Sequence, residues 1–524
     1  MINRRTFLTG SSVAAAGAVG FPHLALSQDG RPARPGQSPR HIIHMVADGM
    51  SMGTLTCADY FSQRRRDQGL TWMKLMAQGD VAHGWMNMRS LNSIVTDSSA
   101  AASSWGSGTR IINGMVNTLG DGTWLKPLYE VFREAGWRRG LVTTTEITHA
   151  TPAGFATNAT SRDDADLIAA QYLDRRVDLL LGGGRKYFKT TGRKDKRDLH
   201  GDFAKAGYVV MNHREDLLQA PLDKPWLGTF SDSHLPYSVD QRQSSALQKS
   251  VPTLAELTRR ALQKLERESH FILQIEGGRV DHACHNCDAA SALNDMVAFD
   301  EAIDEVLAFC QRHPDTLVLI TTDHGNGNLG VNATGSGYGK STWMFENTLG
   351  VRASFPEMLS LLKRKTSLRD ADKPWFKGPL AAPDERQDPK QDMVAAPAEI
   401  VDILHAATGY KVPLRKAELY RPFLEGKGEV MYDLMKSDVA QLGQLLGNHL
   451  AIGWTSNGHT ADYVPIAALG PGAEQFAGFI QNTHIFPAYL AFAGIDFRNP
   501  TEPLVACAGR EAPDVEPPTA YHQA

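Results

Sequence analysis

Residues 96–105 of this chain read Thr-Asp-Ser-Ser-Ala-Ala-Ala-Ser-Ser-Trp, and the short apolar run Ile94-Val95 precedes them. This pattern predicts a strand that turns into a helix, whose small side chains let it pack closely against a neighbour. The backbone N–H groups and the positive end of the helix dipole would surround Ser98, which suits an anion such as phosphate. An ordinary helix cap is the alternative, since Asp and Ser are common capping residues.

Several other segments predict buried strands separated by helices. The expected strands are residues 41–46, 140–145, 177–181, 271–275, 316–321 and 465–470. This alternation predicts an α/β fold with a doubly wound, mainly parallel central sheet and helices on both faces. Asp48, Glu276 and Asp323 closely follow three of the strands. In such folds, ligands bind at the carboxyl ends of the strands.

Aspartate and histidine recur together in the same part of the chain. Asp281 and His285 are four residues apart, so a helix would place both on one face. Asp323-His324 is a second pair, and His459 lies alone in a polar turn. Oxygen and nitrogen ligands of this kind suit Zn²⁺. With the candidate serine, the set predicts two neighbouring metal ions, an arrangement suited to in-line displacement at phosphorus.

The expected metal ions would also explain how a serine could act as the nucleophile. A serine hydroxyl is a poor nucleophile at neutral pH, but a metal ion lowers the pKa of a bound oxygen by several units. Ser98 would therefore need no histidine base. Arg162 would offer a planar fork to two phosphate oxygens.

The joint order of these motifs resembles that of the metal-dependent alkaline phosphatases with a serine nucleophile. The resemblance extends over most of residues 40–330 and returns near residues 453–495. The motifs that match in order are Val46-Ala47-Asp48-Gly49-Met50, Thr96-Asp97-Ser98, Ala150-Thr151-Pro152, Thr160-Ser161-Arg162, Leu181-Gly182-Gly183-Gly184, Glu276 followed by Asp281 and His285, and Thr322-Asp323-His324.

The resemblance implies hydrolysis of phosphate monoesters at a site with two Zn²⁺ and one Mg²⁺. Ser98 would be phosphorylated and then released by water, while Arg162, oriented by Asp97, would hold the phosphate. The implied ligand sets are Asp281, His285 and His459 for the first zinc, Asp48, Asp323 and His324 for the second zinc, and Asp48, Thr151 and Glu276 for the magnesium.

Two histidines distinguish this chain from some bacterial members of that family. His149 and His282 stand where those members carry Asp and Lys, whereas other members, including animal ones, have His at both positions. We expect both to lie near the third metal or the phosphate. His149 fits either a ligand or a polar packing residue, and the identity of the third-site metal stays open.

Two classes of alternative function remain. A phosphodiesterase or a sulfatase would share the fold, and a non-catalytic exported metal-binding protein would share the ligands. A sulfatase motif has Cys or Ser followed by x-Pro-x-Arg, which residues 98–102 lack. Related diesterases often use a Thr nucleophile and lack the clamp that Arg162 supplies. The intact nucleophile and ligand set favour a catalyst.

The N-terminal segment predicts export. Arg4-Arg5 lies in a twin-arginine n-region, an apolar run covers residues 13–21, and small residues precede Gln28. Residues 1–27 therefore indicate a signal peptide for the twin-arginine translocase and a periplasmic or secreted protein. No later apolar run is long enough for an integral membrane segment in the mature chain. The net charge of -4 gives no indication of nucleic-acid-specific binding.

The remaining sequence suggests one catalytic domain, at residues 41–510. We expect a flexible leader at 28–40, a disordered tail at 511–524, and an insertion at about 329–454, where family members carry a variable crown. The resemblance also implies a homodimer.

The chain has five cysteines, an odd number that excludes a disulfide scaffold. Cys284 and Cys287 fit a local disulfide or two free thiols better than a redox pair or half a zinc site.

Overall fold

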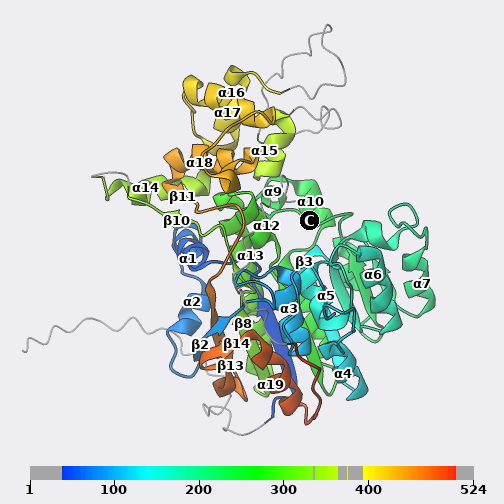
Figure 1. Cartoon of the computed structure of the whole chain (residues 1–524). Coiled ribbons are helices and arrows are strands. Elements are labelled where there is room, and N and C mark those ends of the chain that lie inside the picture. Colours follow the sequence, from blue (N-terminus) through cyan, green and yellow to red (C-terminus); the bar gives the residue numbers. More distant parts are fainter. Residues whose placement is uncertain (1–37, 334–336, 364–374, 376–393, 503–524) are drawn as a thin grey trace, which may run out of the picture.

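The computed structural model describes residues 38–333, 337–363, 375 and 394–502 (Figure 1). Its centre is a ten-stranded sheet in the order β14-β2-β13-β8-β1-β7-β3-β4-β6-β5. Neighbouring strands run parallel, except that β13 is antiparallel to both β2 and β8. The expected α/β fold is thus confirmed. The strands are β1 His41–Val46, β2 Ala82–Asn87, β3 Arg138–Glu146, β4 Leu179–Gly183, β5 Val209–Met211, β6 Trp226–Thr229, β7 Phe271–Glu276, β8 Thr316–Thr321, β13 Tyr463–Leu469 and β14 Gly478–Gln481.

Helices cover both faces of this sheet, as its nearly continuous apolar strands require. In β1, Ile43 and Met45 belong to one hydrophobic core, whereas Ile42 and Val46 belong to the other. The first core contains side chains of α1 Met52–Arg66, α2 Thr71–Met76, α8 Arg214–Gln219, α9 Ser238–Gln243, α11 Leu254–Leu265, α12 Arg279–His285 and α13 Ala289–Arg312. The second contains those of α3 Ser98–Ser107, α4 Leu128–Glu134, α5 Ala150–Ala156, α6 Ala165–Asp174, α7 Leu199–Lys205 and α19 Ile485–Phe492.

Five further helices stand together at one end of the molecule, at the top of Figure 1. They are α14 Lys340–Glu346, α15 Phe355–Leu362, α16 Pro397–Thr408, α17 Leu414–Leu424 and α18 Asp438–Leu450. Buried side chains such as Ile403 and Leu442 join the same hydrophobic core as α13. Two short ladders connect this segment to the body. β9 Gly325–Asn326 pairs with β12 His459–Thr460, and β10 Gly330–Val331 pairs with β11 Ile452–Gly453.

The prediction of a strand directly before Ser98 was wrong. Residues 91–97 contain bends and no strand, and Ile94 is 67% exposed because no neighbouring strand covers it. The side chain of Asn113 replaces a strand ladder. Its Oδ1 accepts a hydrogen bond from the Asp97 N–H at 3.2 Å, and its Nδ2 donates to the Val95 carbonyl at 3.0 Å.

The close packing expected after Ser98 is present between α3 and α5. A Cβ atom added at Gly106 would lie 1.9 Å from the carbonyl oxygen of Gly154. A Cβ added at Gly154 would lie 2.6 Å from the Cβ of Ala102. Both glycines are therefore needed for the two helices to approach this closely, and this approach brings the starts of both helices to the same edge of the sheet.

The structure also decides between the alternatives for the cysteines. Cys284 and Cys287 are both buried free thiols, as are Cys57 and Cys310. The twin-arginine segment 1–27, most of the leader 28–40 and the tail 511–524 lie outside the described residues, so the proposed domain boundaries stay predictions. Among the described helices, none has the length and apolar character needed to cross a bilayer.

Gly154→Ala should destabilise the protein, because its Cβ would overlap α3. Overpacking of this kind costs about 1–3 kcal/mol and should lower the midpoint of thermal unfolding. Gly79→Ala is the matched control, since nothing lies within 4 Å of its added Cβ. An unchanged midpoint for Gly154→Ala, measured by differential scanning calorimetry, would contradict the close contact.

Candidate active site

Three adjacent strands deliver carboxylates to one edge of the sheet. In the parallel register, Val46 of β1 lies beside Glu276 of β7 and Thr321 of β8. Asp48 and Asp323 come two residues after β1 and β8, so they lie beside Glu276. Helix α12 follows β7 and carries Asp281 and His285 on one face, which confirms the expected helix.

Asp48, Asp323 and His324 form the first group of possible metal ligands. One ligand atom from each lies within 4.8 Å of the others, and all three residues are buried. Nε2 of His324 lies 3.2 Å from Oδ2 of Asp323 and 3.6 Å from Oδ1 of Asp48. Neither of these two oxygens accepts a hydrogen bond. These two oxygens, which accept no hydrogen bond, and Nε2 of His324 would suit a cation bound between them.

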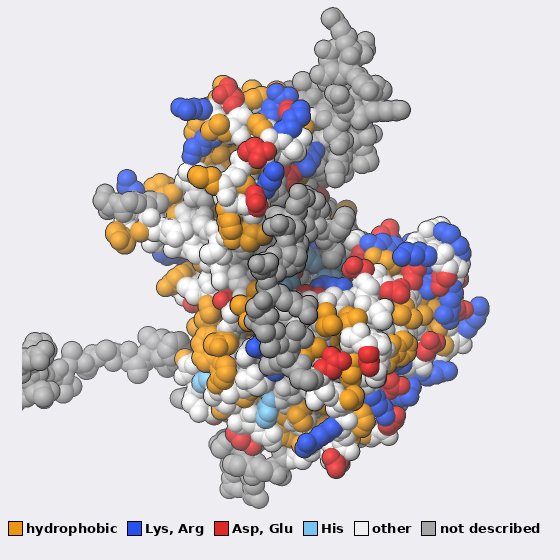
Figure 2. Space-filling model, in the orientation of Figure 1, with side chains coloured by type: hydrophobic (Ala, Val, Ile, Leu, Met, Phe, Trp, Pro, Cys, Tyr) orange, Lys and Arg blue, Asp and Glu red, His pale blue; other side chains and the backbone are white. Residues whose placement is uncertain are grey.

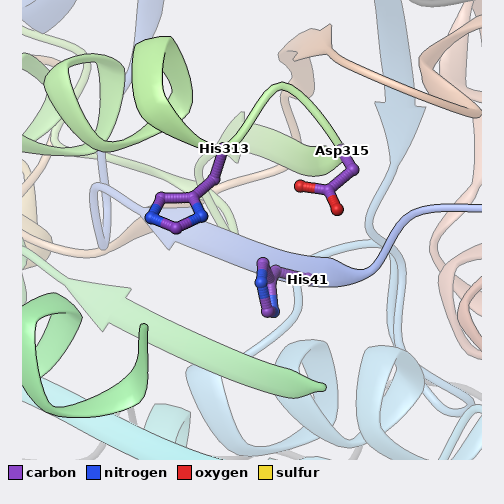
Figure 3. Close-up of side chains that lie close together, drawn as sticks. All are labelled: His41, His313 and Asp315. Carbon is purple, nitrogen blue, oxygen red and sulfur yellow. The ribbon is translucent and has the colours of Figure 1, made fainter. Parts of the chain in front are cut away.

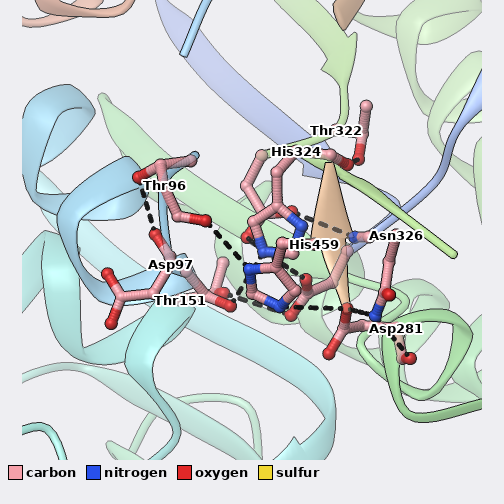
Figure 4. Close-up of polar contacts among 12 residues, drawn as sticks. Thr96, Asp97, Thr151, Asp281, Thr322, His324, Asn326 and His459 are labelled. Carbon is pink, nitrogen blue, oxygen red and sulfur yellow. Dashed lines mark hydrogen bonds and ion pairs between the residues drawn. The ribbon is translucent and has the colours of Figure 1, made fainter. Parts of the chain in front are cut away.

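Asp281, His285 and His459 form the second group (Figure 4 labels Asp281 and His459). Nε2 of His285 lies 3.3 Å from Oδ2 of Asp281 and 3.1 Å from Nε2 of His459. Nε2 of His459 lies 3.6 Å from Oδ1 of Asp281. Antiparallel pairing of β12 with β9 brings His459 here, because it places this residue opposite Asn326, two residues after His324.

Backbone carbonyl groups orient the three imidazoles in the same way. Each ring has its Nδ1 against a carbonyl oxygen, so Nδ1 carries a proton and Nε2 points toward the carboxylates. Ring nitrogens that bind metals are typically fixed in this manner. The Nδ1 to oxygen distances are 2.7 Å for His285 to Asn457, 2.9 Å for His459 to Thr96, and 3.3 Å for His324 to Gly325.

A third group combines Asp48 with Glu276 and His149, whose ligand atoms lie within 4.8 Å of one another. Thr151, from the first turn of α5, donates to Oδ2 of Asp48 at 3.5 Å. Oε1 of the buried Glu276 accepts no hydrogen bond. His149 therefore lies where a ligand would, which favours the first of the two interpretations left open by the sequence.

Four carboxyl groups share this site, and burial makes it costly for all of them to be ionised at once. Asp48, Glu276, Asp281 and Asp323 are all buried. Burial and the neighbouring Asp323 raise the pKa of Asp48, and burial raises the pKa of Glu276 to about 7. Burial opposes ionisation of Asp281 as well, but His285 holds its pKa well below the usual range. Bound cations would remove this mutual repulsion.

Ser98 and Ser99 differ in what their hydroxyl groups contact. Oγ of the buried Ser98 lies 3.1 Å from Nε2 of His324, at the first group of ligands. The Ser99 hydroxyl instead donates to Oδ2 of Asp97 at 2.7 Å. Asp97 is also the N-cap of α3, where its side chain accepts from the Ala100 N–H at 2.8 Å. Only Ser98 therefore faces the ligands.

Arg162 lies beside the start of α3. Its Nη1 donates to Oδ2 of Asp97 at 3.3 Å, and its Nη2 lies 3.3 Å from Nε2 of His149. Burial opposes ionisation of Asp97, but Arg162 lowers its pKa, so the pair remains charged. Asp97 thus links the orientation of Arg162 to the helix that carries the serine.

His282 lies farther along the same edge. Its ring centroid is 5.3 Å from that of His149 and 4.4 Å from that of His234. Arg279 donates to its Nδ1 at 2.7 Å, while its buried Nε2 has no hydrogen-bond partner. In Figure 2, histidine and basic side chains are visible in a hollow between the upper helices and the body.

The structure adds supporting residues that the sequence analysis missed. Asn326 donates to Oδ1 of Asp281 at 2.6 Å, and Thr143 donates to Oε2 of Glu276. Thr143 begins a run of three threonines near the end of β3, and this run is the sequence feature that could have indicated its contact with Glu276. His234 accepts from the Glu146 N–H at 3.0 Å. As a single histidine in a loop, it carries no pattern that identifies it.

The chain is similar to known alkaline phosphatases along most of its length. A family model described as "Alkaline phosphatase" matches residues 39–495. Alkaline phosphatase 3 of Bacillus subtilis is 29% identical over 463 residues, covering 85% of this chain and 87% of that protein. Streptomycin-6-phosphate phosphatase of Streptomyces griseus is 32% identical over 56% of this chain and 75% of its own length.

The fold supports the same relationship. The crystal structure of Thermus thermophilus alkaline phosphatase superposes with a TM-score of 0.78 at 31% identity, covering 90% of this chain and 94% of that one. The cold-active enzyme from Shewanella gives a TM-score of 0.67 at 26% identity, covering 86% of this chain and 99% of its own. The chain therefore belongs to the alkaline phosphatase family, whose members are metal-dependent phosphomonoesterases.

Proposed function

We propose that this phosphomonoesterase acts through a phosphoserine at Ser98, in a site that holds two Zn²⁺ and one Mg²⁺. The observation that carries the proposal is the position of the Ser98 hydroxyl. It lies at the N-terminal end of α3 and 3.1 Å from Nε2 of His324, within a buried set of metal-binding side chains. An attacking oxygen, anion-binding backbone groups and ligands for cations thus meet at one place.

The donor types support this choice of metals. Asp281, His285 and His459 would hold one zinc, and Asp48, Asp323 and His324 the other, because both sets mix imidazole with carboxylate. The third site, with Asp48, Thr151 and Glu276, is rich in oxygen and suits Mg²⁺. His149 would be a further ligand there. When bound, the paired zinc ions supply the Lewis acidity that activates oxygen nucleophiles and stabilises the leaving oxygen.

The residues of the chain perform the remaining tasks. Oγ of Ser98 attacks phosphorus as the P–O bond to the leaving oxygen breaks; the serine proton passes to water, and the leaving alkoxide takes up a proton from water to become the alcohol. Arg162, held by Asp97, binds two non-bridging oxygens of the phosphoryl group. Water then attacks the same phosphorus atom, and Ser98 leaves as inorganic phosphate forms. His282, whose ring centroid is 5.3 Å from that of His149 and whose Nε2 has no hydrogen-bond partner, would be a further contact for bound phosphate.

We propose that the protein is exported and acts in the periplasm or outside the cell as a homodimer. The support for export is the twin-arginine motif with its apolar run and small residues before Gln28. The twin-arginine translocase carries folded proteins, which would allow metal to be loaded before export. The homodimer is expected from the family alone.

Substrate preference tests the proposed function directly. We expect strong turnover of p-nitrophenyl phosphate at alkaline pH, with little turnover of bis-p-nitrophenyl phosphate or p-nitrophenyl sulfate. Chelation should abolish the activity, and Zn²⁺ with Mg²⁺ should restore it. Preference for the diester or the sulfate would indicate one of the alternative enzymes on this fold. No turnover of any substrate by metal-loaded protein would indicate a non-catalytic metal-binding protein.

Ser98→Ala should remove the phosphoenzyme, whereas Ser99→Ala should retain it. Loss of a covalent nucleophile typically lowers kcat by roughly 10³-fold or more. Ser99→Ala removes only a hydrogen bond to Asp97, so its kcat should fall by about tenfold or less. Acid-quenched protein incubated with labelled inorganic phosphate provides the measurement, and its zinc content serves as the control. Label retained in Ser98→Ala and lost in Ser99→Ala would reverse the assignment.

Arg162→Ala should weaken inhibition by inorganic phosphate. Hydrogen bonds to a charged group contribute about 1.5–3 kcal/mol, so the inhibition constant should rise about 10- to 100-fold. Arg162→Lys keeps the charge but loses the planar fork of the guanidinium. We therefore expect this variant to restore phosphate inhibition only in part. Zinc content should stay unchanged in both variants. Unaltered phosphate inhibition in Arg162→Ala would exclude this residue from the phosphate site.

A further inference from the structure

A separate cluster of metal-binding side chains lies at the opposite edge of the sheet (Figure 3). His41 is the first residue of β1, and His313 and Asp315 lie between α13 and β8. One ligand atom from each of the three lies within 4.8 Å of the others. Since β1 rises about 3.3 Å per residue on its way to Asp48, the cluster is roughly 20 Å from the active site.

The imidazole of His41 is buried without a hydrogen-bond partner. The side chain is 0% exposed, and neither Nδ1 nor Nε2 is paired. One face of the ring stacks on Phe271 with a centroid distance of 4.2 Å. A polar group buried in this way is costly unless something binds it.

The backbone fixes the other two side chains next to His41. The Asp315 carbonyl accepts from the backbone N–H of Arg40 at 2.8 Å and from the backbone N–H of His41 at 3.5 Å. The Thr316 N–H donates to the His313 carbonyl at 3.2 Å, which closes the turn between α13 and β8. As Figure 3 shows, the Asp315 carboxylate and the His313 ring flank the same space above His41.

An acidic side chain lies just outside the cluster. Nε2 of His313 lies 3.7 Å from Oε2 of Glu266, which is longer than a hydrogen bond. Its negative charge would still favour a cation bound nearby. Two cationic side chains lie nearby: Arg40 donates to the Ser269 carbonyl at 2.7 Å, and Arg312 lies 3.6 Å from Glu266. The carboxylate of Asp315 would offset their repulsion for a bound ion.

We propose that His41, His313 and Asp315 bind a Zn²⁺ ion at a site separate from the active site. Two imidazoles and one carboxylate form a typical three-ligand zinc set, with water completing the coordination. The ion would join the first residue of the central strand to the connection between α13 and β8. It would thus stabilise the fold without touching the substrate. The proposal is independent of the mechanism at Ser98.

Zinc content per chain tests the proposal. Wild type, His313→Gln and Asp315→Asn are dialysed against the same buffered free Zn²⁺ and measured by inductively coupled plasma mass spectrometry. We expect each variant to lose one zinc per chain while kcat for p-nitrophenyl phosphate stays unchanged. The thermal unfolding midpoint should also respond less to added Zn²⁺. Both substituted side chains are half-buried, so neither substitution removes a core residue.

His270→Gln is the matched control. This exposed histidine lies at the same edge and its Nδ1 is 3.2 Å from the Arg40 carbonyl, but it is outside the cluster. It should keep the zinc content of wild type. Equal zinc content in all four proteins would overturn the proposal.

Wild-type holoenzyme provides a second measurement if the variants fail to fold. In crystals grown at the same free Zn²⁺, we expect an anomalous peak at the zinc edge among the three side chains. The absence of that peak would overturn the proposal.

Discussion

The concentration of buried carboxylates at one edge of the sheet is the constraint on which the rest of the site depends. Parallel pairing of β8, β1 and β7 places Asp323, Asp48 and Glu276 side by side, and Asp281 follows in α12. Arg162 is paired with Asp97, although Asp48 and Asp281 also attract its guanidinium and help to raise its pKa. Bound cations would offset the repulsion among ionised carboxylates, which would couple metal binding to the folded geometry of the site.

Segments that are distant in sequence hold the histidines in position. Nδ1 of His459 donates to the carbonyl of Thr96, which lies two residues before Ser98. Nδ1 of His285 donates to the carbonyl of Asn457. The backbone that presents the serine therefore also sets the direction of a ligand. A shift of the loop before α3 would displace Ser98 and rotate the His459 imidazole at the same time.

Much of the fold was predictable from the sequence, because buried parallel strands are continuous apolar runs. The strand ends also identified Asp48, Glu276 and Asp323. The strand expected before Ser98 was wrong, since hydrogen bonds from the side chain of Asn113 replace a ladder and two apolar residues cannot reveal this. Spacing alone does not select His459, which reaches the site through the pairing of β12 with β9. His234 and Asn326 depend on tertiary contacts and leave no local pattern.

The two short ladders near the site have a consequence for how the chain can vary. Between Val331 and Ile452 the chain leaves the body and returns, and β10 pairs with β11 where it does so. Because both ends of this segment are held together, its closure depends only weakly on its length. Insertions and deletions within it can therefore accumulate without moving His324 or His459. The surface of this segment can therefore diversify separately from the geometry of the site.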